Sequence, residues 1–246
     1  MRAALKHLHT HVTDEAINTE GSPKAPVKEK VIMLNEMTKS DLQIIQSQAW
    51  IREGFQITDL SGKFWESKHN GKDLHASPEK HGDNKCLLSP LRDKYGAGRL
   101  LAIAAEYLHQ TDVGILGGDL NALKDIDKSL HTENQLKDTY LKTGQVEGSK
   151  EGMTWGQMAA IYERHHGLSR VDKLLFCGAI QVEDFETFGM DVEVEDEADK
   201  QQLIKTGLEK GWVTDHLGIK ANFTLSSLPT EPWSIAGKSK KPKRRL

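Results

Sequence analysis

The sequence has few cysteines and no long apolar run, and each absence excludes a class of protein. Its two cysteines, Cys86 and Cys177, lie far apart without the spacing of metal ligands. A disulfide scaffold or zinc knuckle is therefore not expected, and a reducing intracellular compartment fits better. No apolar run approaches the roughly 18 residues of a membrane-spanning helix, and Met1–His7 lacks the apolar centre of a signal peptide. We expect an intracellular protein with no membrane partner.

The chain also lacks a net positive charge over most of its length. The formal net charge is −3, and the tail Lys238–Leu246 holds six positive charges, so residues 1–237 carry −9. An acidic body does not favour a protein that follows a nucleic-acid backbone over a wide face. Phosphate recognition is therefore expected to be local and aided by a metal ion. The tail is typical of a nuclear localisation signal, although a solvated terminus explains it equally well, so both the nucleus and the cytoplasm stay open.

Composition divides the chain into three parts. Residues 1–30 are predicted to be a flexible segment, because Thr13–Lys30 is polar and contains two prolines. The alternating histidines within 1–30, at positions 7, 9 and 11, suit either a transition-metal ligand set or a disordered terminus. Residues 31–228 are predicted to form one domain, in which 66–88 is an irregular polar loop, and 229–246 is the basic tail.

The pattern of apolar residues within 31–228 mixes strands with a few helices. Short apolar or alternating runs predict strands at 31–34, 55–60, 112–116, 170–176, 180–182 and 217–225. Capping residues predict helices that begin at Ser40 and Ser89. This mixture predicts an α+β sandwich.

Polar side chains that suit phosphodiester cleavage follow several of these strands. Gly117-Gly118-Asp119-Leu120-Asn121 places a carboxylate and an amide two residues apart after a buried strand, and its glycines would let a substrate approach. A turn with side-chain hydrogen bonds explains the same residues. Leu34-Asn35-Glu36 ends the first strand in a carboxylate, which suits a hard cation such as Mg²⁺ but is also an ordinary exposed charge.

Histidine chemistry is suggested at the start of the last strand. Thr214-Asp215-His216 places an acid beside an imidazole, and a histidine suits acid–base work when a buried carboxylate fixes its tautomer. Asp172, next to an apolar run, is a candidate for that carboxylate because a buried aspartate needs a partner. A structural histidine is the alternative.

The order of these motifs points to a known family. Glu36, Gly118-Asp119-Leu120-Asn121, Thr154-Trp155, Arg170-Val171-Asp172 and Asp215-His216 follow one another along the chain. This series resembles the endonuclease/exonuclease/phosphatase superfamily, which has the deoxyribonuclease-I-like fold, and is most similar to its tyrosyl-DNA-phosphodiesterase-like branch with fungal relatives. The resemblance covers residues 31–60 and 89–225. It implies a four-layer α/β sandwich that hydrolyses a phosphodiester or phosphate ester, with nucleic-acid ends among the candidate substrates.

The resemblance also implies roles for the residues at the metal and the attacking water. Glu36 and Asp215 would hold Mg²⁺ or Mn²⁺. Asp119 would orient or deprotonate the water, and Asn121 would hold a phosphate oxygen.

A second group of residues would act on the phosphate itself. Asp172 would orient His216, which contacts the phosphate or exchanges a proton. Thr154 would contact the phosphate or pack beside Trp155. Thr214 stands where the family usually has serine and keeps the hydroxyl.

The chain departs from the family pattern in two places, so the expected sandwich is incomplete. The family's first strand ends in a metal-site asparagine that nothing before Val31 supplies, and the loop 66–88 occupies the place of middle strands and an Asn-Thr-His-Leu motif with a catalytic histidine. A segment missed in the gene and a true loss both explain the gap. The open functions are a metal-dependent phosphodiesterase, a degenerate member that keeps weak metal or phosphate binding, and a plain interaction module.

Overall fold

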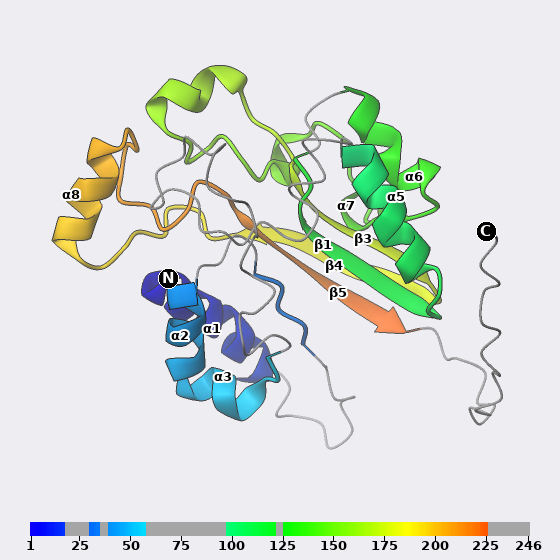
Figure 1. Cartoon of the computed structure of the whole chain (residues 1–246), viewed down its shortest axis with the longest axis horizontal. Helices are drawn as coiled ribbons and strands as arrows, with labels where there is room; N and C mark the ends of the chain where they lie inside the picture. Colours follow the sequence, from blue (N-terminus) through cyan, green and yellow to red (C-terminus); the bar gives the residue numbers. More distant parts are fainter. Residues whose placement is uncertain (18–29, 35–38, 58–96, 122–124, 226–246) are drawn as a thin grey trace, which may run out of the picture.

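The computed structural model describes residues 1–17, 30–34, 39–57, 97–121 and 125–225 (Figure 1). The strands are β1 (Val113–Asp119), β2 (Lys137–Asp138), β3 (Asp172–Gly178), β4 (Ile180–Phe188) and β5 (Gly218–Leu225). The α-helices are α1 (Arg2–Ile17), α2 (Lys39–Ser47), α3 (Ala49–Gly54), α5 (Ala97–Leu108), α6 (Leu130–Glu133), α7 (Thr139–Lys142) and α8 (Glu197–Lys205). The short 3-10 helices are η1 (Asp125–Ser129), η2 (Lys150–Gly152) and η3 (Ile161–His166).

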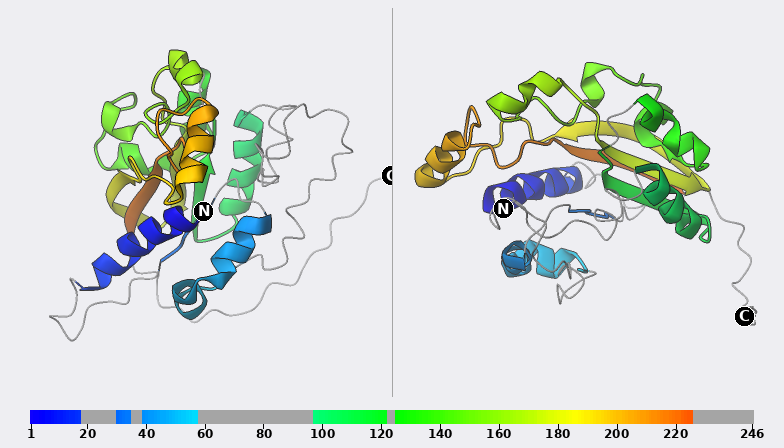
Figure 2. Two further views of the ribbon diagram at one scale, coloured as in Figure 1. Left: turned by 90° about the vertical axis from the view of Figure 1, so that its left-hand side faces the viewer. Right: turned by 45° about the horizontal axis from the view of Figure 1, so that its top comes forward.

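Two antiparallel sheets form the centre of the molecule (Figure 2). The first sheet has the order β1-β3-β2, and the second pairs β4 with β5. The chain passes from β3 to β4 through Gly178, whose φ of +86° is the left-handed conformation that favours glycine. A Cβ atom there would lie 1.9 Å from the carbonyl oxygen of Asp112, so a larger residue would force the turn open.

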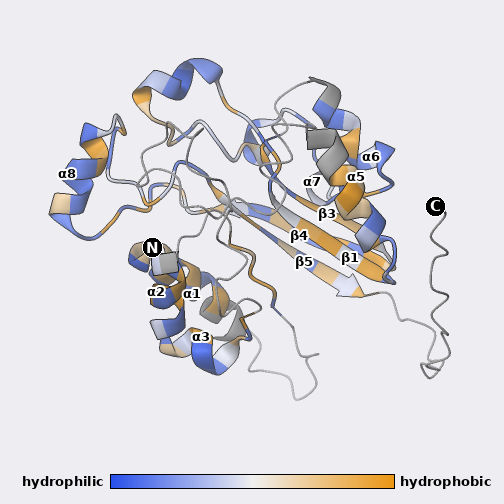
Figure 3. Ribbon diagram, viewed as in Figure 1, coloured by the Kyte–Doolittle hydropathy of each residue, from blue (hydrophilic) through white to orange (hydrophobic). Residues whose placement is uncertain are grey.

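Strand β3 is buried on both faces, as its apolar sequence predicts. Leu175 and Cys177 belong to a core cluster with Leu101 of α5, so they face that helix. Phe176 points the other way, and its ring lies 5.7 Å from Phe223 of β5. The first sheet therefore lies between α5 and the second sheet. Figure 3 shows apolar residues along the strands and on α5, whereas α8 is largely hydrophilic.

The first three helices form a separate small core. Leu5, Ile45 and Ile51 are its buried centre, one from each helix, and each is at most 6% exposed. The structure thus differs from the flexible segment expected at 1–30, because residues 2–17 form helix α1. Apolar residues at positions 1, 5 and 8 repeat with helical spacing, which favours the helix although polar residues follow.

The predicted elements agree with the structure to different degrees. The helix from Ser40 and the strands at 112–116, 170–176, 180–182 and 217–225 are confirmed, although β5 has no fully buried face. The strand predicted at 31–34 is wrong: these residues form no ladder, and Val31 is 77% exposed. A short apolar run without a pairing partner does not make a strand.

Several predictions concern residues outside those described. They are the helix start at Ser89, the end of the strand at 55–60, the loop 66–88 and the tail 229–246. Residues 55–57 are described and form no strand. No helix in the described part of the chain is long and apolar enough to cross a membrane. The mixture of helices and antiparallel sheets confirms the α+β class, while the four-layer arrangement and the missing strands stay predictions.

Candidate active site

Two of the predicted aspartates lie directly opposite each other at the end of the first sheet. Asp119 is the last residue of β1 and Asp172 is the first of β3, and the antiparallel register pairs them. Directly opposed residues of an antiparallel pair project to the same face. The backbone N–H of Leu120 donates to the carbonyl of Val171 at 3.0 Å, which extends the pairing beyond Asp119. The sheet therefore holds both carboxylates on one side.

His216 joins this pair from the segment that leads into β5. Its Nδ1 lies 2.8 Å from Oδ2 of Asp172, and both side chains are largely buried, with 28% and 12% exposure. Burial lowers the pKa of His216, but the hydrogen bond and charge of Asp172, with the charges of Asp215 and Asp119, raise it to about 9. The ring is therefore an imidazolium at neutral pH, which makes it a hydrogen-bond donor rather than a base.

Thr154 supports the Asp172–His216 pair through backbone hydrogen bonds, and its side chain does not reach solvent. It is 0% exposed, and its hydroxyl oxygen accepts hydrogen bonds from the backbone N–H groups of Val171 and Asp172 at 3.2 and 3.1 Å. Its carbonyl accepts from the N–H of Leu217, next to His216, at 2.7 Å. The expected phosphate contact of Thr154 is therefore corrected: the side chain is enclosed and positions the start of β3, which carries Asp172, and the segment that carries His216.

Thr154→Val is expected to lower the free energy of unfolding by roughly 1–3 kcal/mol, because valine keeps the shape but leaves two buried N–H groups without an acceptor. Thr154→Ser keeps the hydroxyl and should lose clearly less. Urea unfolding of both variants beside the wild type measures the difference. An unchanged stability in Thr154→Val would show that the hydroxyl does not stabilise the fold at this position.

Asp215 is held by a contact that the sequence did not reveal. The indole Nε1–H of Trp155 donates to Oδ2 of Asp215 at 3.0 Å. Trp155 also forms isolated β-bridges with Ser169 and with His216. The Thr-Trp motif thus fixes both members of the Asp-His motif. In the sequence, the order of the family motifs indicates only that Trp155 lies near the site. It does not indicate the partner of its indole.

Asp119 and Asn121 form the turn that was the alternative interpretation of their motif. The backbone N–H of Asn121 donates to Oδ1 of Asp119 at 2.7 Å, and the Asn121 side-chain amide donates to Oδ2. Asn121 has a φ of +48°, which asparagine tolerates better than most residues. In this conformation Asn121 orients the Asp119 carboxylate.

The segment that precedes Glu36 passes over β1 close to Asp119. A Cβ atom on Gly117 would lie 2.7 Å from Leu174 and 2.8 Å from the sulfur of Met33. Gly117 therefore allows this segment to pack closely against β1. Met33 is three residues before Glu36, which itself lies outside the described residues.

The donor groups of the site fit a hard cation in chemistry but not in number. Asp119 and Asp215 supply carboxylate oxygens, the ligand type that Mg²⁺ prefers. Within the described ranges, however, no group of three histidine, cysteine, aspartate or glutamate side chains is placed to hold a metal ion. A complete site would need a further ligand, and the predicted one is Glu36.

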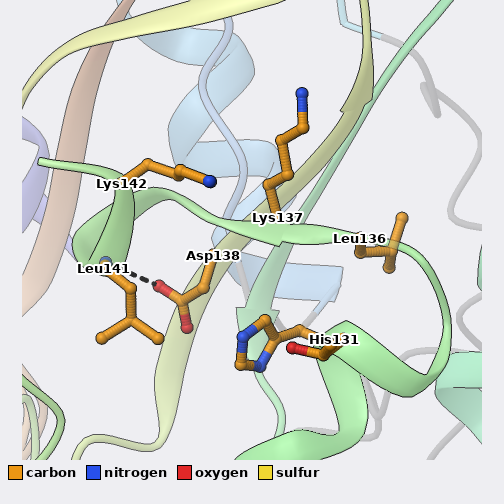
Figure 4. A pocket seen from close by; sticks show the side chains of 7 residues that line it. His131, Leu136, Lys137, Asp138, Leu141 and Lys142 are labelled. Carbon is orange, nitrogen blue, oxygen red and sulfur yellow. Dashed lines mark hydrogen bonds between the residues drawn. The ribbon is translucent and has the colours of Figure 1, made fainter.

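A buried ion network lies near the site but has a different role. Arg170, from the Arg-x-Asp motif, forms ion pairs with Asp138 and Glu147. Asp138 also lines a pocket of about 340 Å³ with His131, Lys137 and Lys142, and Figure 4 shows the Leu141 N–H directed at its carboxylate. Neither the ion pairs nor the pocket lining includes a predicted site residue.

Comparisons with known proteins find partial structural likeness. No protein-family model and no curated protein matches the chain. A humanized TDP2 of D. rerio with 14 mutations matches at 15% identity over 55% of this chain and 50% of that one, with a TM-score of 0.36. An endonuclease/exonuclease/phosphatase from Beutenbergia cavernae matches at 20% identity over 55% and 32%, with a TM-score of 0.37. A mannosyl-6-phosphatase from Bacteroides thetaiotaomicron matches at 17% identity over 54% and 47%, with a TM-score of 0.36.

These matches are limited in extent. The aligned part spans about half or less of each solved chain. At such identities and TM-scores the likeness decides neither fold nor function, and the geometry of the site is the basis for a proposal.

Proposed function

We propose that this chain is a metal-dependent phosphodiesterase or phosphatase-like hydrolase of the endonuclease/exonuclease/phosphatase superfamily. The observation that supports the proposal most is the Asp172–His216 pair at 2.8 Å, held beside Asp119 by direct strand register. A carboxylate that fixes an imidazolium next to a second carboxylate suits the hydrolysis of a phosphate ester. The ordered motifs of the sequence support the same class.

The proposed roles follow from the protonation of the site. Asp172 and the neighbouring acidic residues raise the pKa of His216 to about 9, although burial lowers it. His216 therefore donates a hydrogen bond to a phosphate oxygen and stabilises the negative charge that develops there. Asp172 fixes the ring so that Nε2 is the donor. Asp119, oriented by Asn121, accepts a hydrogen bond from the attacking water. Asn121 reaches the phosphate only after its amide leaves Asp119.

The proposed cofactor is Mg²⁺ or Mn²⁺, held by Asp215 and Glu36. Such an ion would polarise the phosphate oxygens when bound. The Trp155 indole fixes the Asp215 carboxylate in advance, which reduces the ordering that a ligand must undergo. The substrate class proposed is a phosphodiester, with nucleic-acid ends as one candidate, and the basic tail makes nuclear accumulation part of the proposal.

The test is a steady-state assay of the purified chain on bis(p-nitrophenyl) phosphate with and without Mn²⁺. We expect slow, metal-dependent turnover, because the sequence lacks the Asn-Thr-His-Leu motif in which the family has a catalytic histidine. The Asp119→Ala, His216→Ala double variant should abolish it, since such groups contribute roughly 10²–10⁴-fold each. His109→Ala is the matched control, because this exposed histidine contacts the carbonyl of Asn134 away from the site.

The outcomes separate the two functions that stay open. Turnover that persists in the double variant would overturn the assignment of the site. Phosphate binding without turnover, lost in the double variant, would identify a degenerate member of the same superfamily. That alternative has one observation in its favour, because the Asn121 amide is engaged with Asp119 rather than presented to a ligand.

A further inference from the structure

Two histidines of helix α1 bring their ring nitrogens side by side. His7 and His11 are one helical turn apart, a spacing that puts both on the same face. Their Nε2 atoms lie 3.2 Å apart, and their ring planes are inclined at 76°. His9, between them, points elsewhere and stacks on Trp50 at 4.7 Å.

The distance between the two nitrogens matches the geometry of a metal ion. Imidazole nitrogens bind Zn²⁺ at about 2.0–2.1 Å, so two of them in a tetrahedral site lie about 3.3–3.4 Å apart. Histidines at positions i and i+4 of a helix are a known metal-binding spacing. The pair therefore needs little rearrangement to bind one ion through both Nε2 atoms.

We propose that His7 and His11 chelate a divalent transition-metal ion of the class that prefers imidazole, Cu²⁺ or Zn²⁺. This site is separate from the carboxylate site at the end of β1 and does not depend on the proposed hydrolase function. Coordination requires each ring proton to sit on Nδ1, so the N–H···N hydrogen bond of the free pair is replaced by two metal–nitrogen bonds. No net proton is gained or lost in this exchange.

The surroundings hold the two rings in place. The ring of His7 stacks on Phe188 at 6.2 Å and that of His11 lies 4.9 Å from the same ring, at the end of β4. Both histidines are partly buried. A ligand pair with fixed rotamers loses less conformational entropy on binding. Since the described side chains offer no third histidine, cysteine, aspartate or glutamate at this place, water would complete the coordination.

The experiment is a titration of the purified full-length chain with Cu²⁺ or Zn²⁺ in competition with a chromogenic chelator. His7→Ala and His11→Ala should each weaken binding by about 10²-fold, because a second ligand on the same helix raises the effective concentration of its partner. His9→Ala is the matched control, on the same helix but on another face, and should bind as the wild type does.

Two further measurements make each outcome decisive. The electron paramagnetic resonance spectrum of the Cu²⁺-loaded chain should show two nitrogen ligands in the wild type and in His9→Ala, and fewer in His7→Ala. Circular dichroism checks that each variant folds, and a glutamine substitution at the same position replaces an alanine variant that does not. Equal affinity in all variants, or no saturable binding, would overturn the proposal. Asp215→Ala should leave this site intact even if the proposed hydrolase activity is absent.

Discussion

Asp138→Ala is expected to lower the free energy of unfolding by about 3–5 kcal/mol, the cost of removing one partner of a buried ion pair. Both oxygens of Asp138 accept from Arg170, at 3.1 and 2.8 Å, and the two side chains are 0% and 2% exposed. The same carboxylate caps helix α7 by accepting from the N–H groups of Tyr140 and Leu141 at 3.0 and 3.4 Å.

The loss is large because the buried guanidinium of Arg170 would lose its carboxylate partner and could not reach water in its place. Arg170 would keep its ion pair with Glu147, whose side chain is 27% exposed. It would also keep its position 5.1 Å from the ring of Tyr140. Neither replaces two buried hydrogen bonds to a carboxylate. Arg170 also directly precedes Val171 and Asp172, so its displacement would disturb the start of β3.

Urea unfolding monitored by tryptophan fluorescence measures this effect. Asp138→Asn separates the contributions, because an asparagine still caps the helix but lacks the charge. Glu209→Ala is the matched control, since it breaks the exposed Arg164–Glu209 pair, which is expected to matter far less. A loss in Asp138→Ala no greater than that of the control would show that the pair is not a source of stability.

The sequence located the strands, although not their exact ends, because strand signals are local. Apolar runs located β1 and β3, and the structure places Asp119 as the last residue of β1 and Asp172 as the first residue of β3. Their pairing across the sheet needed only the antiparallel register. The Asp172–His216 contact was predicted because a buried aspartate needs a partner, and the structure confirms it.

What the sequence did not predict depends on contacts between distant residues. The ion pair of Arg170 with Asp138 joins positions 32 apart, and the Trp155–Asp215 hydrogen bond joins positions 60 apart. No local spacing specifies either pair. The family resemblance leaves Thr154 either at the phosphate or packed beside Trp155, and whether its hydroxyl faces solvent or a backbone N–H is decided by packing. The same applies to α1, whose burial depends on α2 and α3.

Asp172→Asn is expected to lower the pKa of His216 well below the wild-type value of about 9, and to weaken the dependence of stability on pH. Burial disfavours the charged ring, and the hydrogen bond and charge of Asp172 are the strongest of the opposing influences. The folded state of the wild type therefore binds the proton more tightly than the unfolded chain, whose histidine has its ordinary value of 6.5. The resulting stabilisation is fully present below pH 6.5 and is lost as the pH rises through about 9.

The stabilisation from the protonated His216 follows from the difference between its folded and unfolded pKa values. At about 1.4 kcal/mol per pKa unit, it is on the order of 3 kcal/mol in the wild type. Urea unfolding at pH 6 and at pH 9.5, in EDTA so that no cation acts on Asp215, should show that decline in the wild type and a much smaller one in Asp172→Asn. The pKa itself is read from the His216 ring signals by NMR. Asp184→Asn is the control, because this exposed carboxylate of β4 contacts Asn222 and no histidine. Parallel pH profiles for the wild type and Asp172→Asn would mean that Asp172 does not hold the proton on His216, and the imidazolium role proposed for the site would have to be abandoned.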